Sequence, residues 1–204
     1  MQIRRNEELE RQFVDGLSAI SANRPSSGTR SVGPHVSGII QDIAYQMELL
    51  RRPTLSNSDD PTSLFAVGFV WEDAIGKQLA ILQGIQLGQF ECVVDGIIGT
   101  PDRYRPGTGE IDEFKATWMS TSHDIMGEKF WRWWAQVKAY CYMLNAYWAN
   151  IYAFHVNGDY RPPRPDTRVY SALFTKLELS NNWALITNHN QKMVRERGEW
   201  WLTK

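Results

Sequence analysis

The sequence has few cysteines and lacks a long apolar run. Its two cysteines, Cys92 and Cys141, are too few for a four-cysteine iron–sulfur cluster, and we expect both to be buried thiols. No run of about 18 apolar residues and no signal segment near Met1 occurs, so the sequence predicts neither a membrane span nor export. These absences favour a protein of the cytoplasm with no membrane partner.

A large excess of either charge is also missing. The 204 residues carry a net charge of −1, so any surface for a polyanion must be local. The candidates are basic residues of the helix over 128–148, of the Pro-rich loop and of the last helix: Lys129, Arg132, Lys138, Arg161, Arg164, Arg168, Lys192, Arg195 and Arg197. The four histidines show no paired metal-ligand spacing. Hydrophobic residues make up 43% of the sequence, which allows a sizeable core and favours one domain.

The periodicity of apolar residues divides the chain into two parts of one domain, 1–62 and 63–204. The first part is expected to contain helices and a flexible connector: a helix that begins in the charged residues 1–8 and continues to Ile20, the connector 21–34, a helix from Ser37, and the loop 52–62. The second part is expected to alternate helices and strands: helix 64–83, strands 97–105 and 110–118, helix 128–148, strand 149–156, loop 158–167, a strand to Leu177 and helix 182–197.

One hairpin carries most of the chemistry in the sequence. Its two strands are joined by Pro106–Gly109, a four-residue turn typical of antiparallel neighbours. If the loop is symmetric, facing residues have numbers that sum to 215, which places Asp102 opposite Glu113. The two-residue period of a strand places Lys115 on the same face as Glu113.

Two acids that face each other across a strand pair need a counter-charge. At about 5 Å and an effective dielectric constant of about 20, their repulsion is roughly 3 kcal/mol. A hard divalent cation such as Mg²⁺ is suitable, because it prefers oxygen ligands, takes one or two carboxylates and keeps waters for chemistry. Lys115 adds a movable positive donor. The alternative is that these side chains are ordinary solvated charges of an edge strand.

Two nearby acids are set aside. Asp112 points to the opposite face, where the register places it beside Arg103 as a structural pair. Asp95 precedes Gly96 between two apolar runs, which is typical of a tight turn.

Two helices place polar residues on apolar faces. Gln136 and Tyr140 are four residues apart, hence on one face of the helix over 128–148, which is apolar nearly all round and is expected to be buried. Glu72 lies on the apolar stripe of the helix over 64–83, where a carboxylate needs an ion partner or a metal. The alternatives are a satisfied core pair for Gln136 and Tyr140, and a boundary ion pair for Glu72.

Together these residues resemble the PD-(D/E)xK nuclease superfamily, in particular its RecB-like and lambda-exonuclease-like phage exonucleases. The order is the same: a helix glutamate, a strand aspartate, a Glu-x-Lys strand and a Gln-x-x-x-Tyr helix. The likeness spans about 64–157 and is carried by Gly99-Thr-Pro-Asp102, Glu113-Phe-Lys115 and Gln136-Val-Lys-Ala-Tyr140. It implies an α/β fold with a central mixed β-sheet flanked by helices.

The resemblance also implies a set of metal ligands. Asp102, Glu113 and the backbone carbonyl of Phe114 would hold Mg²⁺, for which Mn²⁺ would substitute. Glu72 would be an added direct or water-mediated ligand. Some RecB-like nucleases carry an upstream histidine ligand, which makes His35 of interest, although it is not assigned to the site.

Further roles and the substrate follow from the same resemblance. Lys115 would orient or help deprotonate the attacking water, and Gln136 and Tyr140 would position the nucleophile, the metal-site side chains or the DNA backbone. The implied activity is that of a metal-dependent DNA exonuclease acting on linear duplex ends in viral or bacterial recombination or repair. Lambda-type relatives suggest a homotrimer, and a single-strand annealing protein is a candidate partner.

Two other functions fit the same residues. The first is a restriction-like or structure-specific endonuclease on the same fold, which would cut closed circular DNA. The second is a catalytically silent DNA or protein adaptor, against which the complete set of acids and lysine argues.

Overall fold

The computed structural model describes residues 1–9, 11–12, 31–51, 90–156 and 165–203. Its elements in chain order are β1 (Gln2–Arg5), α2 (Val36–Arg51), β2 (Cys92–Val94), β3 (Ile97–Gly99), β4 (Arg103–Arg105), β5 (Glu110–Thr117), the 3₁₀ helix η2 (Glu128–Phe130), α4 (Trp131–Met143), β6 (Trp148–His155), β7 (Asp166–Leu173), α5 (Lys176–Arg197) and the 3₁₀ helix η3 (Trp200–Thr203).

The main sheet is mixed. Its five strands lie in the order β1-β7-β6-β5-β4, and β2 and β3 form a separate two-stranded sheet. The β5–β6 pair is parallel and the other pairs are antiparallel. Parallel neighbours need a crossover connection, and α4 supplies it between β5 and β6. This architecture confirms the expected α/β class with a central mixed sheet.

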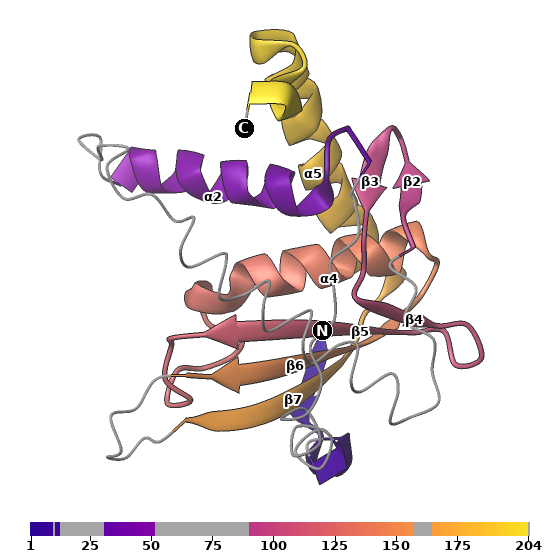
Figure 1. Ribbon diagram of the computed structural model, residues 1–204, viewed down its shortest axis with the longest axis vertical. Helices are drawn as coiled ribbons and strands as arrows, with labels where there is room; N and C mark the ends of the chain where they lie inside the picture. The colour runs from indigo at the N-terminus through magenta and orange to yellow at the C-terminus, as the bar shows by residue number, and fades with distance from the viewer. Residues whose placement is uncertain (10, 13–30, 52–89, 157–164, 204) are drawn as a thin grey trace, which may run out of the picture.

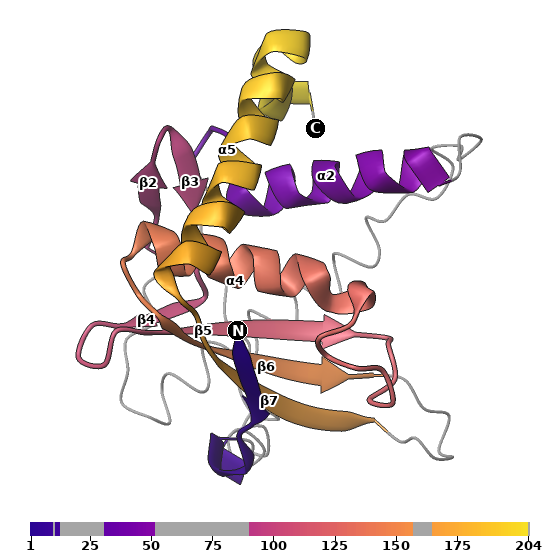
Figure 2. The same cartoon turned by 180° about the vertical axis from the view of Figure 1, so that it is seen from behind.

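The elements form three layers in Figure 1, and Figure 2 shows the same order from behind. Among the described elements, the main sheet forms the first layer, α4 lies across one of its faces, and α2 and α5 lie beyond α4. A helix with neighbours on both sides needs apolar residues around most of its circumference. The prediction that this helix is buried is therefore confirmed, with Trp134, Val137 and Cys141 all buried along it.

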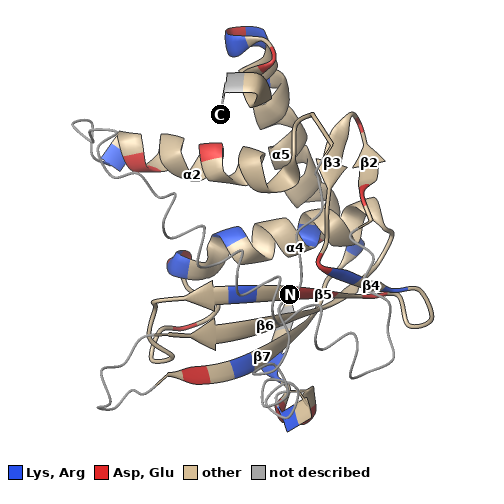
Figure 3. Ribbon diagram, viewed as in Figure 1, with Lys and Arg blue, Asp and Glu red and all other residues tan. Residues whose placement is uncertain are grey.

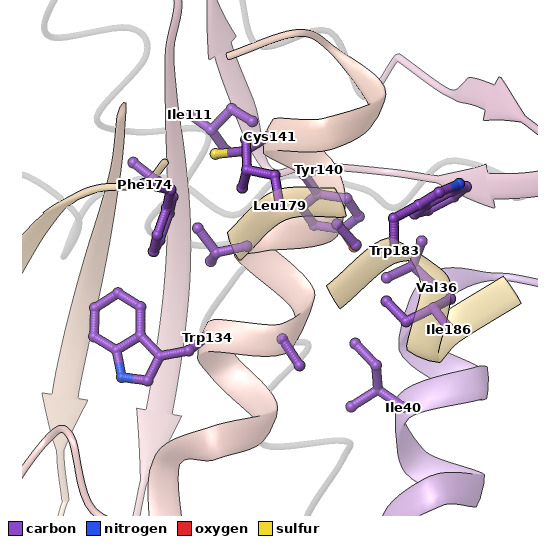
Figure 4. Packing of buried hydrophobic residues seen from close by; sticks show 14 of the residues in the cluster. Val36, Ile40, Ile111, Trp134, Tyr140, Cys141, Phe174, Leu179, Trp183 and Ile186 are labelled. Carbon is purple, nitrogen blue, oxygen red and sulfur yellow. The ribbon is translucent and has the colours of Figure 1, made fainter. Parts of the chain in front are cut away.

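The hydrophobic core lies where these layers meet (Figure 4). Ile111 of β5 and Phe174, just after β7, belong to the same buried cluster as Val36 of α2 and Ile186 of α5. Complete burial of a large apolar side chain contributes about 1.5–3 kcal/mol, so this cluster holds α4 against both neighbouring layers. Because α4 cannot shift without disturbing the core, it is a rigid support for any polar residue that it presents.

The single strand expected over 97–105 is wrong. The chain leaves β3 at Gly99, bends at 100–102 and enters a different sheet as β4. Pro101 has no backbone N–H to continue a ladder. Gly99 marks a close approach, because a Cβ there would lie 2.6 Å from the sulfur of Met143.

The helix expected over 128–148 ends early. After α4 stops at Met143, Asn145 adopts a left-handed backbone with φ 50°. Asn tolerates this conformation, which commonly terminates helices. Trp148, expected in the helix, is the first residue of β6.

Residues 2–5, expected to open a helix, form the strand β1 instead, and helical residues begin at Glu7; the expected continuation over 13–20 lies outside the described residues. β1 pairs with β7, and Asn6 follows β1 with its side chain accepting a hydrogen bond from Leu9 N at 3.0 Å. The strand is an edge of the main sheet and owes its position to β7, a partner far along the chain. The following helix, α2, begins at Val36, so Ser37 lies in its first turn and does not precede it.

The last helix begins six positions earlier than expected, at Lys176 instead of Asn182. β7 ends at Leu173, and a capping box of Thr175 and Glu178 starts α5. The box satisfies two backbone donors of the first turn and fixes this boundary.

Several predicted segments lie outside the described residues, namely 52–62, the Glu72 helix over 64–83, most of the connector 21–34 and most of the loop 158–167. The division at residue 62 stays a prediction. No helix in the described ranges is both long and apolar enough to cross a membrane.

Candidate active site

The hairpin has the register expected from its turn. Arg103 pairs with Asp112 and Arg105 with Glu110, so facing numbers sum to 215 as predicted. Asp102 comes immediately before β4, and its Oδ2 accepts a hydrogen bond from the backbone N–H of Phe114 at 2.7 Å. The Asp102 carboxylate is therefore held at the backbone of β5, next to Glu113.

Glu113 and Lys115 form an ion pair on the same face of β5. The Glu113 side chain is 1% exposed, and its Oε1 lies 2.7 Å from Lys115 Nζ. Its Oε2 lies 3.5 Å from Asp102 N, which is long for a hydrogen bond. The ammonium group and the Phe114 amide together offset part of the repulsion expected between the two acids.

Helix α4 adds a polar pair above these residues. Gln136 Nε2 donates to the Tyr140 hydroxyl oxygen at 2.8 Å. Burial raises the pKa of the Tyr140 phenol well above its usual range, and the negative charge of Glu113 raises it further. The phenol therefore keeps its proton, and because its oxygen already accepts from Gln136, the hydroxyl can donate to another acceptor.

The structure thus brings five of the predicted site residues together on one side of the sheet: Asp102, Glu113, Lys115, Gln136 and Tyr140. The backbone of Phe114 belongs to the same place, while its ring turns to the other face and packs against Tyr152, with centroids 5.0 Å apart. Glu72 lies outside the described residues.

The donor set at this site consists of oxygen atoms. Mg²⁺ is usually held by one or two carboxylates and several waters, so Asp102 and Glu113 suit this ion. Structural and catalytic zinc sites generally use three or four protein ligands, most often His and Cys. No group of three or more His, Cys, Asp or Glu side chains with metal-binding geometry occurs in the described part of the chain. The carboxylate oxygens of Asp102 and Glu113 are donors of the kind that a hard cation takes.

The two acids set aside from the site have structural partners. Asp112 faces Arg103, as predicted, with Arg103 Nε 3.4 Å from its Oδ2. Asp95 and Gly96 form the tight turn between β2 and β3, with φ of 52° and 73°. The Asp95 carboxylate also accepts from Trp183 Nε1 at 2.8 Å, which ties this turn to α5.

Sequence reasoning missed the strongest partners of Asp112. Arg105 Nε and Nη2 donate to its two oxygens at 2.8 and 2.7 Å, and Asn150 Nδ2 donates at 2.8 Å. Arg105 is two residues after Arg103, so the two side chains lie on the same face of the hairpin. Strand alternation could therefore have indicated Arg105 as a partner of Asp112. Asn150 is on β6, and nothing local indicates that pairing.

The cationic candidates differ in their surroundings. α4 carries basic but no acidic residues (Figure 3). Arg132 in this helix and Lys129 just before it are exposed, whereas Lys138 lies over the ring of Phe174 at 5.7 Å and is partly buried. His35 uses its Nε2 to contact the carbonyl oxygen of Ser31 at 2.8 Å.

Comparison with known proteins shows a shared fold. No family model and no curated protein matches the sequence. The chain is similar to the crystal structure of LHK-Exo in complex with dAMP, with a TM-score of 0.50 and 12% identity over 80% of this chain and 89% of that chain. The comparison with the alkaline exonuclease LHK-Exo from Laribacter hongkongensis has a TM-score of 0.49 and 13% identity, over 84% of this chain and 92% of that chain. The comparison with a phage related exonuclease from Haemophilus somnus 129PT has a TM-score of 0.40 and 15% identity, over 88% of this chain and 91% of that chain.

The first of these likenesses shows that the chain shares the fold of LHK-Exo, in agreement with the expected α/β fold with a central mixed β-sheet.

Proposed function

We propose that this protein is a metal-dependent DNA exonuclease that hydrolyses phosphodiester bonds at linear duplex ends. The observation that carries the proposal is the state of Glu113. This buried carboxylate receives one hydrogen bond of ordinary length from the described residues, from Lys115, and lies beside a second acid, Asp102. A buried acid is costly unless its charge is compensated, and a cation shared by Glu113 and Asp102 would add to the compensation that Lys115 gives.

The proposed ligands are Asp102, Glu113 and the backbone carbonyl of Phe114, with Glu72 as an added ligand. Bound Mg²⁺, or Mn²⁺ in its place, would stabilise negative charge on the phosphate and lower the pKa of water. In this arrangement the protein's oxygen donors fix the position of the ion, and the core behind α4 keeps bulk water away from one side of the site.

The remaining residues handle the nucleophile and the phosphate. Lys115 reaches Glu113 with a flexible ammonium group, which can orient the attacking water and help it to lose a proton. Tyr140 keeps its proton and can donate to an oxygen of the nucleophile or phosphate, while Gln136 fixes the direction of its hydroxyl group. In the reaction, the water oxygen loses a proton and forms a bond to phosphorus as the P–O bond to the sugar oxygen of the neighbouring nucleotide breaks, and that leaving oxygen takes a proton from solvent to become a hydroxyl group.

DNA is the proposed substrate for two reasons. Exposed Lys129 and Arg132 lie at the N-terminal end of α4, where the helix dipole adds to their positive charge and favours phosphate. The exonuclease that shares this fold at a TM-score of 0.50 was crystallised with dAMP, a mononucleotide.

The decisive experiment offers linear and closed circular duplexes to the protein with Mg²⁺, Mn²⁺ or a chelator. Glu113→Gln and Lys115→Ala test the site, and Asp42→Asn, a buried acid between α2 and α5, is the matched control. Metal-dependent release of mononucleotides from linear DNA, lost in both site variants and kept in the control, is expected. Nicking of closed circular DNA would mean that the protein is an endonuclease and not an exonuclease. Absence of any metal-dependent cutting would overturn the proposal in favour of a catalytically silent adaptor.

We further propose a role in viral or bacterial recombination or repair, a cytoplasmic location, a homotrimer and an annealing-protein partner. Light scattering of the purified protein tests the trimer, and a mass of one protomer would contradict it. Co-purification with a candidate annealing protein expressed in the same cells tests the partner.

A further inference from the structure

We propose that a buried polar network on the far face of the sheet consists of positioning residues that hold Asp102 against Glu113. We call it the back-face ladder, and its members are Asn6, Ser171, Asn150, Asp112, Arg103 and Arg105. The inference rests on the proposed nuclease function, because it assigns these residues to the same site.

The back-face ladder crosses the main sheet from edge to edge. Asn6, just after β1, donates to Ser171 Oγ on β7 at 3.0 Å, and Ser171 donates to Asn150 Oδ1 on β6 at 2.6 Å. Asn150 donates to Asp112 Oδ1 on β5 at 2.8 Å. Arg105 on β4 completes the network with its two hydrogen bonds to Asp112. Neighbouring strands are thus tied by side chains as well as by their backbones.

The middle of the ladder lies in the interior of the protein, while Asn6 and Arg105 at its two ends are half-buried. Asp112 is 0% exposed, Ser171 2% and Arg103 4%. Moving paired charges out of water costs several kcal/mol per ion, and an apolar replacement of similar size is often at least as stable. The ladder is therefore weak evidence for stability. Its chemistry is better suited to specifying which residues of neighbouring strands face each other.

Register matters most at β4, which has three residues and lies at the edge of the sheet. A shift of two residues would keep every side chain on its own face, yet it would move Asp102 by about 7 Å along β5. One direction would set Arg103 against Phe114, and the other would leave Asp112 facing Pro101. The observed register sets both arginines beside the buried carboxylate.

The ladder and the site are direct neighbours in the chain. Arg103 follows Asp102, and Asp112 precedes Glu113, so the pair on the back face fixes the pair of acids on the front face. The hydrogen bond from Phe114 N to the Asp102 carboxylate depends on this alignment of the two strands. A loosened β4 would break that hydrogen bond and separate the two acids.

The test compares Asp112→Asn with Asp42→Asn in the full-length protein. Asp42 is also a buried acid, bonded to Arg197 at 3.0 Å and His189 at 2.9 Å, but it joins α2 to α5 and does not touch β4 or β5. Each variant is measured for Mn²⁺ dissociation constant by calorimetry without DNA, free energy of unfolding, and hydrogen exchange of the Phe114 amide by NMR.

Asp112→Asn is expected to weaken Mn²⁺ binding by about 10- to 100-fold, the range for residues that orient metal ligands. The Phe114 amide should exchange faster relative to amides in β6 and β7. Asp42→Asn should lower stability while leaving both readouts at their wild-type values. Equal changes in the two variants, or no change in Asp112→Asn, would overturn the positioning role.

Arg105→Lys keeps the test decisive if Asp112→Asn fails to fold. Its side chain is 24% exposed, so lysine can keep the charge while losing the two-pronged contact. We expect a smaller shift in the same two readouts, and wild-type values would contradict the proposal. If the wild-type protein binds no Mn²⁺ and cuts no DNA, the nuclease proposal fails, whereas Phe114 exchange still decides whether the ladder holds Asp102.

Discussion

Asp112 and Glu113 are neighbours on β5 and equally buried, at 0% and 1% exposure, but their carboxylates have opposite surroundings. On the back face, Asp112 accepts three hydrogen bonds, from Arg105 and Asn150. On the front face, Glu113 receives one of ordinary length in the described structure. A carboxylate has about four acceptor positions, so the first acid is nearly saturated and the second keeps capacity for a ligand.

This difference separates two uses of buried charge. The saturated acid fixes the geometry of the sheet, whereas the unsaturated acid makes the fold less favourable than it could be. Buried polar groups in proteins usually have hydrogen-bond partners, and the exceptions occur mainly at functional sites. The contrast predicts that a back-face substitution will lower both stability and metal binding, whereas a front-face substitution will lower activity with little change in stability.

The largest effect is expected for Asp112→Asn on stability. Breaking a buried ion pair typically costs about 3–5 kcal/mol, and here Arg103 and Asn150 would lose the negative charge that they face, while Arg105 keeps its ion pair with Glu110 at 3.0 Å. Urea denaturation followed by tryptophan fluorescence measures the loss. A change below about 1 kcal/mol would show that the back-face acid is not a structural anchor.

Glu113→Gln should lower activity while leaving stability nearly unchanged. Its cleavage rate is expected to fall by about 10²–10³-fold, because a charge directed at the reacting groups is lost. Its free energy of unfolding should change by about 1 kcal/mol or less, since removing the acid also removes repulsion with Asp102. A stability loss as large as that of Asp112→Asn would remove the distinction between the two faces.

Tyr140→Phe should have a smaller effect on activity. The variant keeps the buried ring and loses the hydroxyl that Gln136 orients, so cleavage should slow by about 10- to 100-fold. Tyr142→Phe on the same helix is the matched control, because Tyr142 is 36% exposed and stacks on Trp183 away from the acids. Equal rates for the two variants would remove Tyr140 from the site.

The smallest expected effect is on stability at acid pH, and it concerns Asp42, a buried acid outside the sheet whose carboxylate has two hydrogen-bond partners. Burial alone would raise the pKa of Asp42, but hydrogen bonds from His189 and Arg197 outweigh it and lower the pKa. A carboxylate with a lowered pKa in the folded state stabilises the fold above its unfolded pKa, and this contribution is lost as pH falls through the folded value.

Wild-type stability should therefore fall more steeply than that of Asp42→Asn between about pH 5 and pH 3. Denaturant midpoints at several pH values measure this difference. Parallel pH curves for the two proteins would mean that Asp42 does not stabilise the fold through its charge.

Local signals in the sequence determined much of the site. The turn Pro106–Gly109 set the register, because hairpin loop length decides which residues face each other. Helical spacing placed Gln136 and Tyr140 on one face, and strand alternation separated Asp112 from Glu113. Each of these inferences depends on residues close together in the chain.

The features that were missed depend on distant partners or on single residues that stop an element. β1 is a strand because β7 lies beside it, and Asn150 meets Asp112 only once β6 lies next to β5. The break at Pro101 and the capping box at Thr175 were local signals, but apolar periodicity does not register them. Glu72 and its helix lie outside the described residues, so that part of the candidate site stays a prediction.

The parallel pairing of β5 with β6 has a consequence for how the molecule could be assembled. Glu113, Lys115, Gln136 and Tyr140 all belong to one strand–helix–strand unit, so most of the chemistry is encoded in a continuous piece of chain. Asp102 enters through an edge hairpin. Lengthening the exposed turn of that hairpin should therefore detach one acid while the rest of the constellation stays intact, which makes the turn a natural point for engineering an on–off control.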